Sequence, residues 1–212
     1  MNIYAWVLLV SLAVAAGADW SAVARHRSDL ESVAKPAVLV ILMLLAWLLR
    51  ADSVDYGVYL LIGLVLCLLG DVLLLGQSDR HFLAGLVAFL LAHVAYIAAF
   101  RRIPGETPIW WGVIAVVTVA LVVLFSWILP LARASLRDGI PLLTYAVVVA
   151  GMAALAWATG LPVVGAGATL FLASDALIAF DRFVRPVSWG KLVVHITYHV
   201  GQLLIVLGML RT

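Results

Sequence analysis

The sequence is short of charge, of cysteine and of long polar segments. Only 11% of its 212 residues are charged, against about 25% in a typical soluble domain, while 66% are hydrophobic and the mean hydropathy is +1.19. A single cysteine, Cys67, excludes a disulfide framework and a multi-cysteine metal site. A net charge of +2 is too small to indicate a nucleic-acid partner. The composition therefore favours a chain that lies in a membrane.

Apolar runs of about 20 residues, the length that a helix needs to cross a bilayer, recur along the whole chain. The in–out alternation of a membrane barrel is missing, so helices are the structure that satisfies the backbone in lipid. We expect an all-α fold, a polytopic bundle of eight transmembrane helices. Their expected ranges are 3–20, 36–49, 56–75, 82–100, 109–129, 140–158, 161–180 and 189–210.

The distribution of basic residues predicts the orientation of the chain. No Lys or Arg precedes the first span, so the charged start of a signal peptide is missing and we interpret this segment as a membrane helix. Nine of the 13 Lys and Arg residues lie in odd-numbered connections, which places both termini outside the cytoplasm by the positive-inside rule. We expect a multi-pass protein of a bacterial cell membrane.

Two aspartates interrupt apolar runs at matching places. Asp71 follows Gly70 near the end of the third span, and Asp175 follows Ser174 in the seventh span, close to half a chain length later. An ionised carboxylate at membrane depth costs roughly 3 kcal/mol or more, so such a residue usually faces a cavity or a partner. We expect both acids to reach a shared polar site, although a structural role as hydrogen-bonding contacts between helices stays open.

A second pair of residues indicates an internal repeat. Pro36 opens the second expected span and Pro141 opens the sixth, at nearly the same separation as the two acids. We expect one transmembrane domain, residues 1–212, built from two similar four-helix halves, 1–105 and 106–212. Because each half has an even number of spans, the halves would have the same orientation in the membrane.

Other polar residues within the spans are candidates for the same site. His93 lies near the middle of the fourth span with Tyr96 one turn later, and Asp71 on the preceding helix could reach it. Lys35 is a boundary charge, a ligand for a lipid phosphate or the partner of an acid. Tyr145, near the start of the sixth span, is interpreted as an interfacial packing residue.

The last span is the most polar of the eight. It contains Lys191, His195, Thr197, Tyr198, His199 and Gln202. His195 and His199 share one helix face, which is a spacing that zinc ligands use, and Asp71 or Asp175 could complete such a site. No H-E-x-x-H context accompanies the pair, so we expect neither a metal nor a cofactor.

Short motifs follow one another in a fixed order from residue 35 to the C-terminus. They are carried by Lys35-Pro36, Gly70-Asp71, Phe82, Gly85, Phe89, His93, Tyr96, Phe171, Ser174-Asp175, Tyr198 and Gln202. Together they resemble the YhhN-like integral membrane family, which includes the lysoplasmalogenases. The resemblance implies an ether hydrolase of lipid metabolism. Its substrate would be a lysophospholipid within the membrane, a lysoplasmalogen, cleaved at its vinyl ether bond to a fatty aldehyde and glycerophosphocholine or glycerophosphoethanolamine.

This chemistry needs an acid that protonates carbon and a second group that activates water, by the logic of the glycosidases. We expect Asp71 and Asp175 to divide these roles, in an order that the sequence leaves open, with His93 as a third catalytic residue. Lys35, with Arg80 or Lys191, would hold the phosphate. The remaining substrate-binding candidates are Tyr96, Ser174, Tyr198 and Gln202.

Two other functions fit parts of the pattern. A small proton-coupled transporter would also use duplicated halves and buried acids. A haem- or metal-binding membrane protein would use His93 with His195 or His199 as axial ligands. The sequence also leaves a homodimer open.

Overall fold

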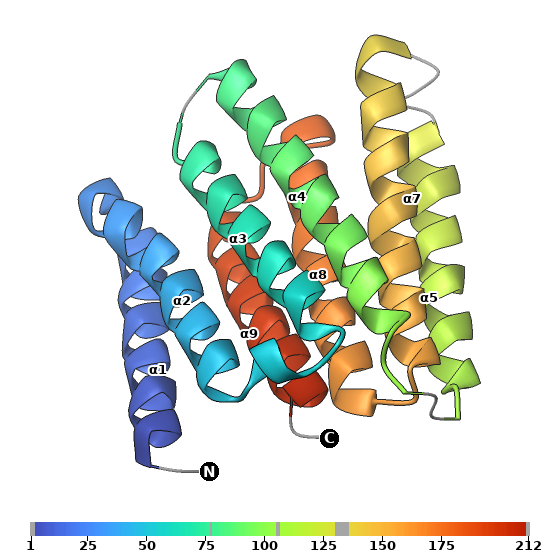
Figure 1. The fold of residues 1–212 in the computed structure, drawn as a ribbon. Coiled ribbons are helices and arrows are strands. Elements are labelled where there is room, and N and C mark those ends of the chain that lie inside the picture. The colour runs from blue at the N-terminus through green and yellow to red at the C-terminus, as the bar shows by residue number, and fades with distance from the viewer. Residues whose placement is uncertain (1–2, 77, 105–106, 130–135, 211–212) are drawn as a thin grey trace. The chain divides into compact units, whose positions relative to one another are not determined.

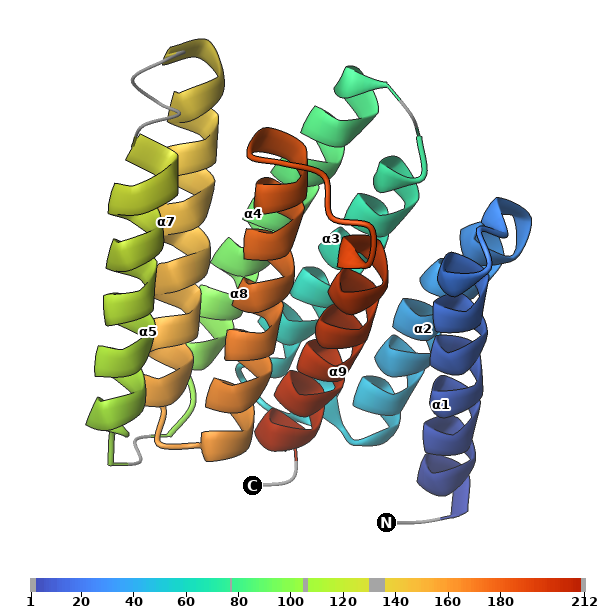
Figure 2. The ribbon, with the colours of Figure 1, turned by 180° about the vertical axis from the view of Figure 1, so that it is seen from behind.

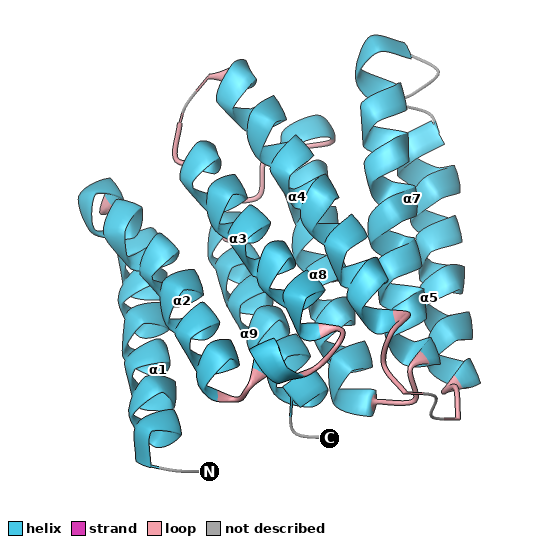
Figure 3. Ribbon diagram, in the orientation of Figure 1, coloured by secondary structure: helices cyan, strands magenta, loops and turns pink. Residues whose placement is uncertain are grey.

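The computed structural model describes residues 3–76, 78–104, 107–129 and 136–210 (Figure 1). Helices dominate these ranges, and no strand occurs in them (Figure 3). The chain forms two compact units. The first unit comprises Met1–Arg102 and Val206–Thr212, and the second comprises Ile103–Ile205.

The first unit contains four long helices joined by short connections. They are α1 (Ile3–Ala24), α2 (Ser28–Leu48), α3 (Gly57–Leu74) and α4 (Asp79–Phe100), with a short 3₁₀ turn, η1 (Ala51–Ser53), before α3. Each helix packs against the next one in the chain, as Figures 1 and 2 show from opposite sides. The start of α3 is also tied to the end of α9, because the Tyr56 hydroxyl donates to the Met209 carbonyl at 2.9 Å.

The second unit has a shorter first helix. That helix, α5 (Trp110–Val123), continues into a π-helical turn, η2 (Leu124–Ile128). It is followed by α7 (Leu136–Ala158), α8 (Pro162–Phe183) and α9 (Gly190–Leu210), and α9 belongs to this unit as far as Ile205. Helix α7 packs against both α5 and α8.

These helices confirm the expected polytopic membrane bundle. In the part of the chain that the structure describes, seven helices are long and apolar enough to cross a bilayer, and the apolar segment Trp110–Ser126 is shorter. The protein is therefore an integral, multi-pass membrane protein. The boundary between the two units, after Arg102, lies close to the predicted boundary between the halves 1–105 and 106–212. The similarity of the halves stays a prediction.

The two prolines open the apolar runs but do not begin the helices. Pro36 lies inside α2, which begins at Ser28, and Pro141 lies inside α7, which begins at Leu136. The first turns of both helices are polar, so the apolar run that predicted each span starts later than the helix. A proline inside a helix donates no hydrogen bond to the carbonyl four residues earlier, which locally weakens the helix.

Glycines set the distance between neighbouring helices. A Cβ atom on Gly63 would lie 2.6 Å from the Tyr96 ring, and one on Gly70 would lie 2.6 Å from the Phe89 ring, so both rings of α4 need a glycine of α3 opposite them. In the second unit, a Cβ atom on Gly167 would lie 2.7 Å from the backbone oxygen of Gly201. Such small residues allow close packing where lipid provides no hydrophobic driving force.

Gly167→Ala should lower the thermal stability of the detergent-solubilised protein. The added methyl group meets the α9 backbone, which cannot move aside like a side chain, and overpacking of this kind costs roughly 1–3 kcal/mol. The matched control is Gly151→Ala, because nothing lies within 4 Å of the added Cβ atom and the helix gains up to about 1 kcal/mol of propensity. Circular dichroism during heating measures both. Equal unfolding temperatures would contradict the close contact.

Candidate active site

The first acid forms a buried ion pair. Asp71 lies near the C-terminal end of α3 with 1% of its surface exposed, and Lys35 lies on α2, next to Pro36. The Lys35 Nζ atom is 3.1 Å from Asp71 Oδ1. Of the three predicted roles for Lys35, the structure therefore shows the pairing with an acid. A pair buried this deeply is held together because separating the charges would leave each one uncompensated.

Two further acids lie in this part of the first unit, and the sequence analysis missed both. Asp19 on α1 is fully buried, and α1 packs against α2. Glu31 on α2 is buried one turn before Lys35, on the same helix face. Asp19 interrupts the apolar run of the first span just as Asp71 interrupts the third, so the same signal could have identified it. The four-residue spacing of Glu31 and Lys35 was a second available signal.

The predicted histidine and tyrosine of α4 lie on its buried face. His93 is fully buried between Phe89 and Tyr96, the two residues whose rings lie against glycines of α3. The Tyr96 hydroxyl is 3.9 Å from the sulfur of Cys67. His93 therefore belongs to the stripe of α4 that faces α3, and its contact with Asp71 stays a prediction.

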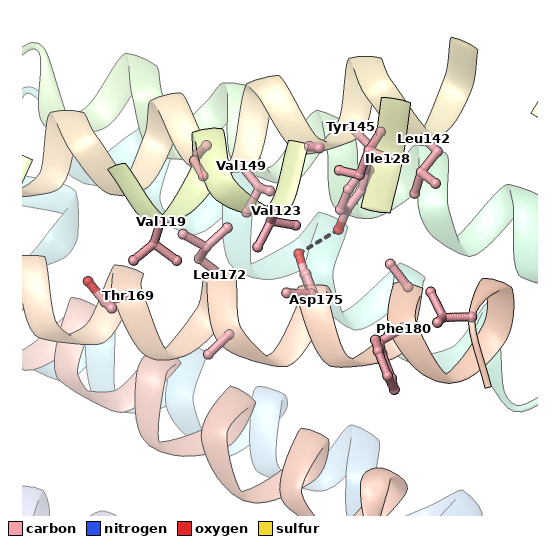
Figure 4. Close-up of a pocket in the computed structure, with 17 residues that line it drawn as sticks. Val119, Val123, Ile128, Leu142, Tyr145, Val149, Thr169, Leu172, Asp175 and Phe180 are labelled. Atoms are coloured by element: carbon pink, nitrogen blue, oxygen red, sulfur yellow. Dashed lines mark hydrogen bonds between the residues drawn. The ribbon is translucent and has the colours of Figure 1, made fainter. Parts of the chain in front are cut away.

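The second acid is bound by a neutral partner. The Tyr145 hydroxyl on α7 donates to Asp175 Oδ2 on α8 at 2.7 Å, and both residues are buried (Figure 4). The interpretation of Tyr145 as interfacial packing is therefore wrong. The Ser174 hydroxyl donates mainly to the Phe171 carbonyl, at 2.7 Å, and lies 3.4 Å from Asp175 Oδ1. The sequence does not show which neighbouring helix a tyrosine in an apolar run faces, so only the fold could identify the pair of Tyr145 and Asp175.

Asp175 and Tyr145 line a cavity of about 170 Å³ among α5, η2, α7 and α8 (Figure 4). Thr169 is the third polar residue in the wall, and the other described residues that line it are apolar. Val119, Val149 and Leu172 are among these. The second acid thus faces a mainly hydrocarbon-like space, whereas the first acid faces a lysine.

Four polar residues of α9 are buried, namely His195, Tyr198, His199 and Gln202. Tyr198 meets Phe171 of α8 edge to face at 5.2 Å between ring centroids, and the rings of His195 and His199 are 6.0 Å apart. Gln202 is fully buried one turn later. Within the described ranges, no group of three or more His, Cys, Asp or Glu side chains is placed to hold a metal ion.

The predicted residues divide between the two units. Lys35, Asp71, His93 and Tyr96 belong to the first unit, and Ser174, Asp175, Tyr198 and Gln202 belong to the second. The structure brings Lys35 to Asp71, and Tyr145, which was not a site candidate, to Asp175. That the two acids act at one shared site stays a prediction. Chemically, the units offer a charged carboxylate paired with a cation and a carboxyl group hydrogen-bonded in an apolar cavity.

Lys35→Met should destabilise the protein by about 3–5 kcal/mol, because it leaves the buried Asp71 carboxylate without its cation. The double variant Lys35→Met/Asp71→Leu should recover most of this loss, since apolar residues often replace a buried ion pair at little cost. Thermal unfolding of the purified proteins in detergent measures both effects. If the double variant is less stable than Lys35→Met, the ion pair does not hold α2 and α3 together.

The sequence is similar to several named proteins. The sequence is similar to lysoplasmalogenase TMEM86B of Mus musculus, with 31% identity over 176 residues that cover 81% of this chain and 72% of that protein. It is similar to lysoplasmalogenase TMEM86A of Bos taurus, with 28% identity over 71% of this chain and 65% of the other. A lysoplasmalogenase of Mycobacterium tuberculosis is 31% identical over 77% of this chain and 67% of the other.

The chain thus spans roughly two thirds to three quarters of the length of these relatives. No solved structure matches this one. The family model described as the YhhN family matches residues 30–209, a range that contains both Asp71 and Asp175 and leaves Asp19 outside. This match confirms the resemblance seen in the motifs, and the chain belongs to the YhhN family.

Proposed function

We propose that this protein is a membrane hydrolase that cleaves the vinyl ether bond at sn-1 of lysoplasmalogens. The products are a fatty aldehyde and glycerophosphocholine or glycerophosphoethanolamine. The single observation that carries the proposal is the Asp175–Tyr145 pair inside an apolar cavity of a YhhN-family protein. Relatives that bear the name lysoplasmalogenase support the same reaction.

Asp175 is the proton donor in this proposal. Hydrolysis begins when a proton is transferred to the β-carbon of the vinyl ether, and Asp175 lines a mainly apolar cavity that suits an alkenyl chain. Tyr145 donates to Oδ2, so in this proposal the proton lies on Oδ1, the oxygen that is 3.4 Å from the Ser174 hydroxyl. Water then adds to the oxocarbenium ion and gives a proton to the second carboxylate; that proton later passes to the glycerol oxygen, and the hydroxyl proton of the hemiacetal returns to Asp175. The hemiacetal breaks its bond to the glycerol oxygen and gives the aldehyde and the alcohol.

Asp71 supplies the carboxylate. It forms an ion pair with Lys35, whose Nζ atom is 3.1 Å away. A fixed negative charge stabilises an oxocarbenium ion and can accept a proton from the attacking water, as the paired carboxylates of glycosidases do. This assignment gives the two acids different roles because their partners differ, which the sequence alone could not decide.

Arg185 is the proposed phosphate ligand. Its guanidinium carbon lies 5.7 Å from the centroid of the Phe180 ring, and Phe180 lines the cavity. Phe180 follows Asp175 by five residues, about 7.5 Å along the helix axis, a separation that the glycerol of a lysophospholipid can bridge. Lys35 was the predicted phosphate ligand, but its ammonium group is paired with Asp71. We place the enzyme in a bacterial cell membrane, with Arg185 on the cytoplasmic side.

Asp71→Asn and Asp175→Asn should each lower the rate of aldehyde release from a lysoplasmalogen at least about a hundredfold, the contribution of one positioned acid or base. The assay compares the vinyl ether with its saturated ether analogue, which has no double bond to protonate and should not react with any variant. Unfolding temperatures measured in parallel separate loss of chemistry from loss of fold. Near-normal aldehyde release from both variants would contradict the proposed mechanism.

A further inference from the structure

A second hollow lies on the outer side of α5 and α7. It has a volume of about 180 Å³ and is lined by residues of α5, the start of η2 and α7. Val117, Leu121 and Val147 in its wall are 42%, 46% and 58% exposed. Because these helices carry apolar side chains at membrane depth, this outer hollow faces lipid chains in the bilayer.

The outer hollow and the cavity of Asp175 share three lining residues. These are Ala120 of α5 and Ala146 and Ala150 of α7, and we refer to them as the alanine seam. The side chains that line both spaces are therefore methyl groups. Ala146 directly follows Tyr145, so one end of the seam lies beside the phenol that binds Asp175.

The N-terminal end of α5 packs against Trp157, whereas the part beside the alanine seam has few buried residues. Trp157 fills the space beside Gly112 of α5 and Gly165 of α8, where added Cβ atoms would lie 2.3 and 2.4 Å from its ring. Its Nε1 atom donates to Thr169 Oγ1 at 3.0 Å. Within α5, only Gly112 and Val116 are buried.

The residues beyond Val116 continue into the π-helical turn η2, which lies next to both hollows through Leu124 and Ile128. Single π-helical turns occur often at functional sites and break the regular hydrogen-bond ladder. The C-terminal part of α5 therefore has few buried side chains and an irregular hydrogen-bond pattern beside α7.

We propose, on the basis of the proposed function, that the hydrocarbon chain of the lysophospholipid enters the Asp175 cavity sideways from the bilayer, between α5 and α7 across the alanine seam. The occupant is one alkenyl chain, because both hollows are apolar and the seam is lined by single methyl groups. The vinyl ether then lies beside Asp175, with the phosphate toward Arg185 and the tail toward the seam. No step through water is needed to deliver the substrate.

Ala120→Phe tests the seam with a matched control on the same helix. The phenyl group would occupy space at the alanine seam and block the hydrocarbon chain. The value of kcat/KM for the vinyl ether should therefore fall at least about tenfold, the lower range for a steric change in an apolar pocket. Val122→Phe adds a phenyl group two residues later at a side chain that is 61% exposed and lines neither hollow. It should stay within about twofold of the unchanged protein. Ala150→Phe repeats the test from α7 if Ala120→Phe does not fold.

A photoreactive lysophospholipid, with a diazirine in its chain, tests entry separately from chemistry. Illumination in membranes should label peptides of α5 and α7 in the unchanged protein and in Val122→Phe, and should label them far less in Ala120→Phe. Labelling without any aldehyde release would overturn the proposed function and leave the entry route standing. Equal labelling and equal kcat/KM in Ala120→Phe and Val122→Phe would overturn the entry route and leave the function standing.

Discussion

A carboxyl group inside a bundle of apolar helices needs a partner, and each unit of this protein supplies a different one. Asp71 is paired with the ammonium group of Lys35, whereas Asp175 accepts a hydrogen bond from the phenol of Tyr145 in an apolar cavity. In both cases the partner comes from the helix that contains a proline, α2 or α7. The acids have similar positions in the sequence, and their partners decide what each can do.

Close helix packing holds these pairs in place. Gly70 directly precedes Asp71 and accommodates the Phe89 ring, and Gly167 of α8 meets Gly201 of α9, backbone against backbone. In lipid, such contacts replace the hydrophobic driving force of a soluble core. Helix α5 is packed less closely, because few of its residues are buried and its C-terminal end continues into a π-helical turn. The second unit therefore combines a closely packed side that carries the acid with a loosely packed side that faces the bilayer.

The number and order of the helices follow from the apolar runs, and the two candidate acids follow from the places where those runs are interrupted. The partners could not be predicted as readily. Hydropathy does not show which neighbouring helix a side chain faces, so Tyr145 was wrongly interpreted as an interfacial residue. Lys35 had three possible roles until the structure gave its distance to Asp71. Pro36 and Pro141 do not mark the helix starts, because helices continue beyond the hydrocarbon-length segment that hydropathy detects.

The account rests on the difference between the two carboxyl groups. If Asp71 is the charged partner of Lys35 and Asp175 holds the proton that begins hydrolysis, their infrared signals at neutral pH must differ. The most direct measurement is the carbonyl stretch of protonated carboxyl groups in the membrane-reconstituted protein and its single Asn variants. The account predicts that Asp175→Asn removes a protonated-carboxyl band and that Asp71→Asn leaves this band in place. A band lost in Asp71→Asn and retained in Asp175→Asn would contradict it.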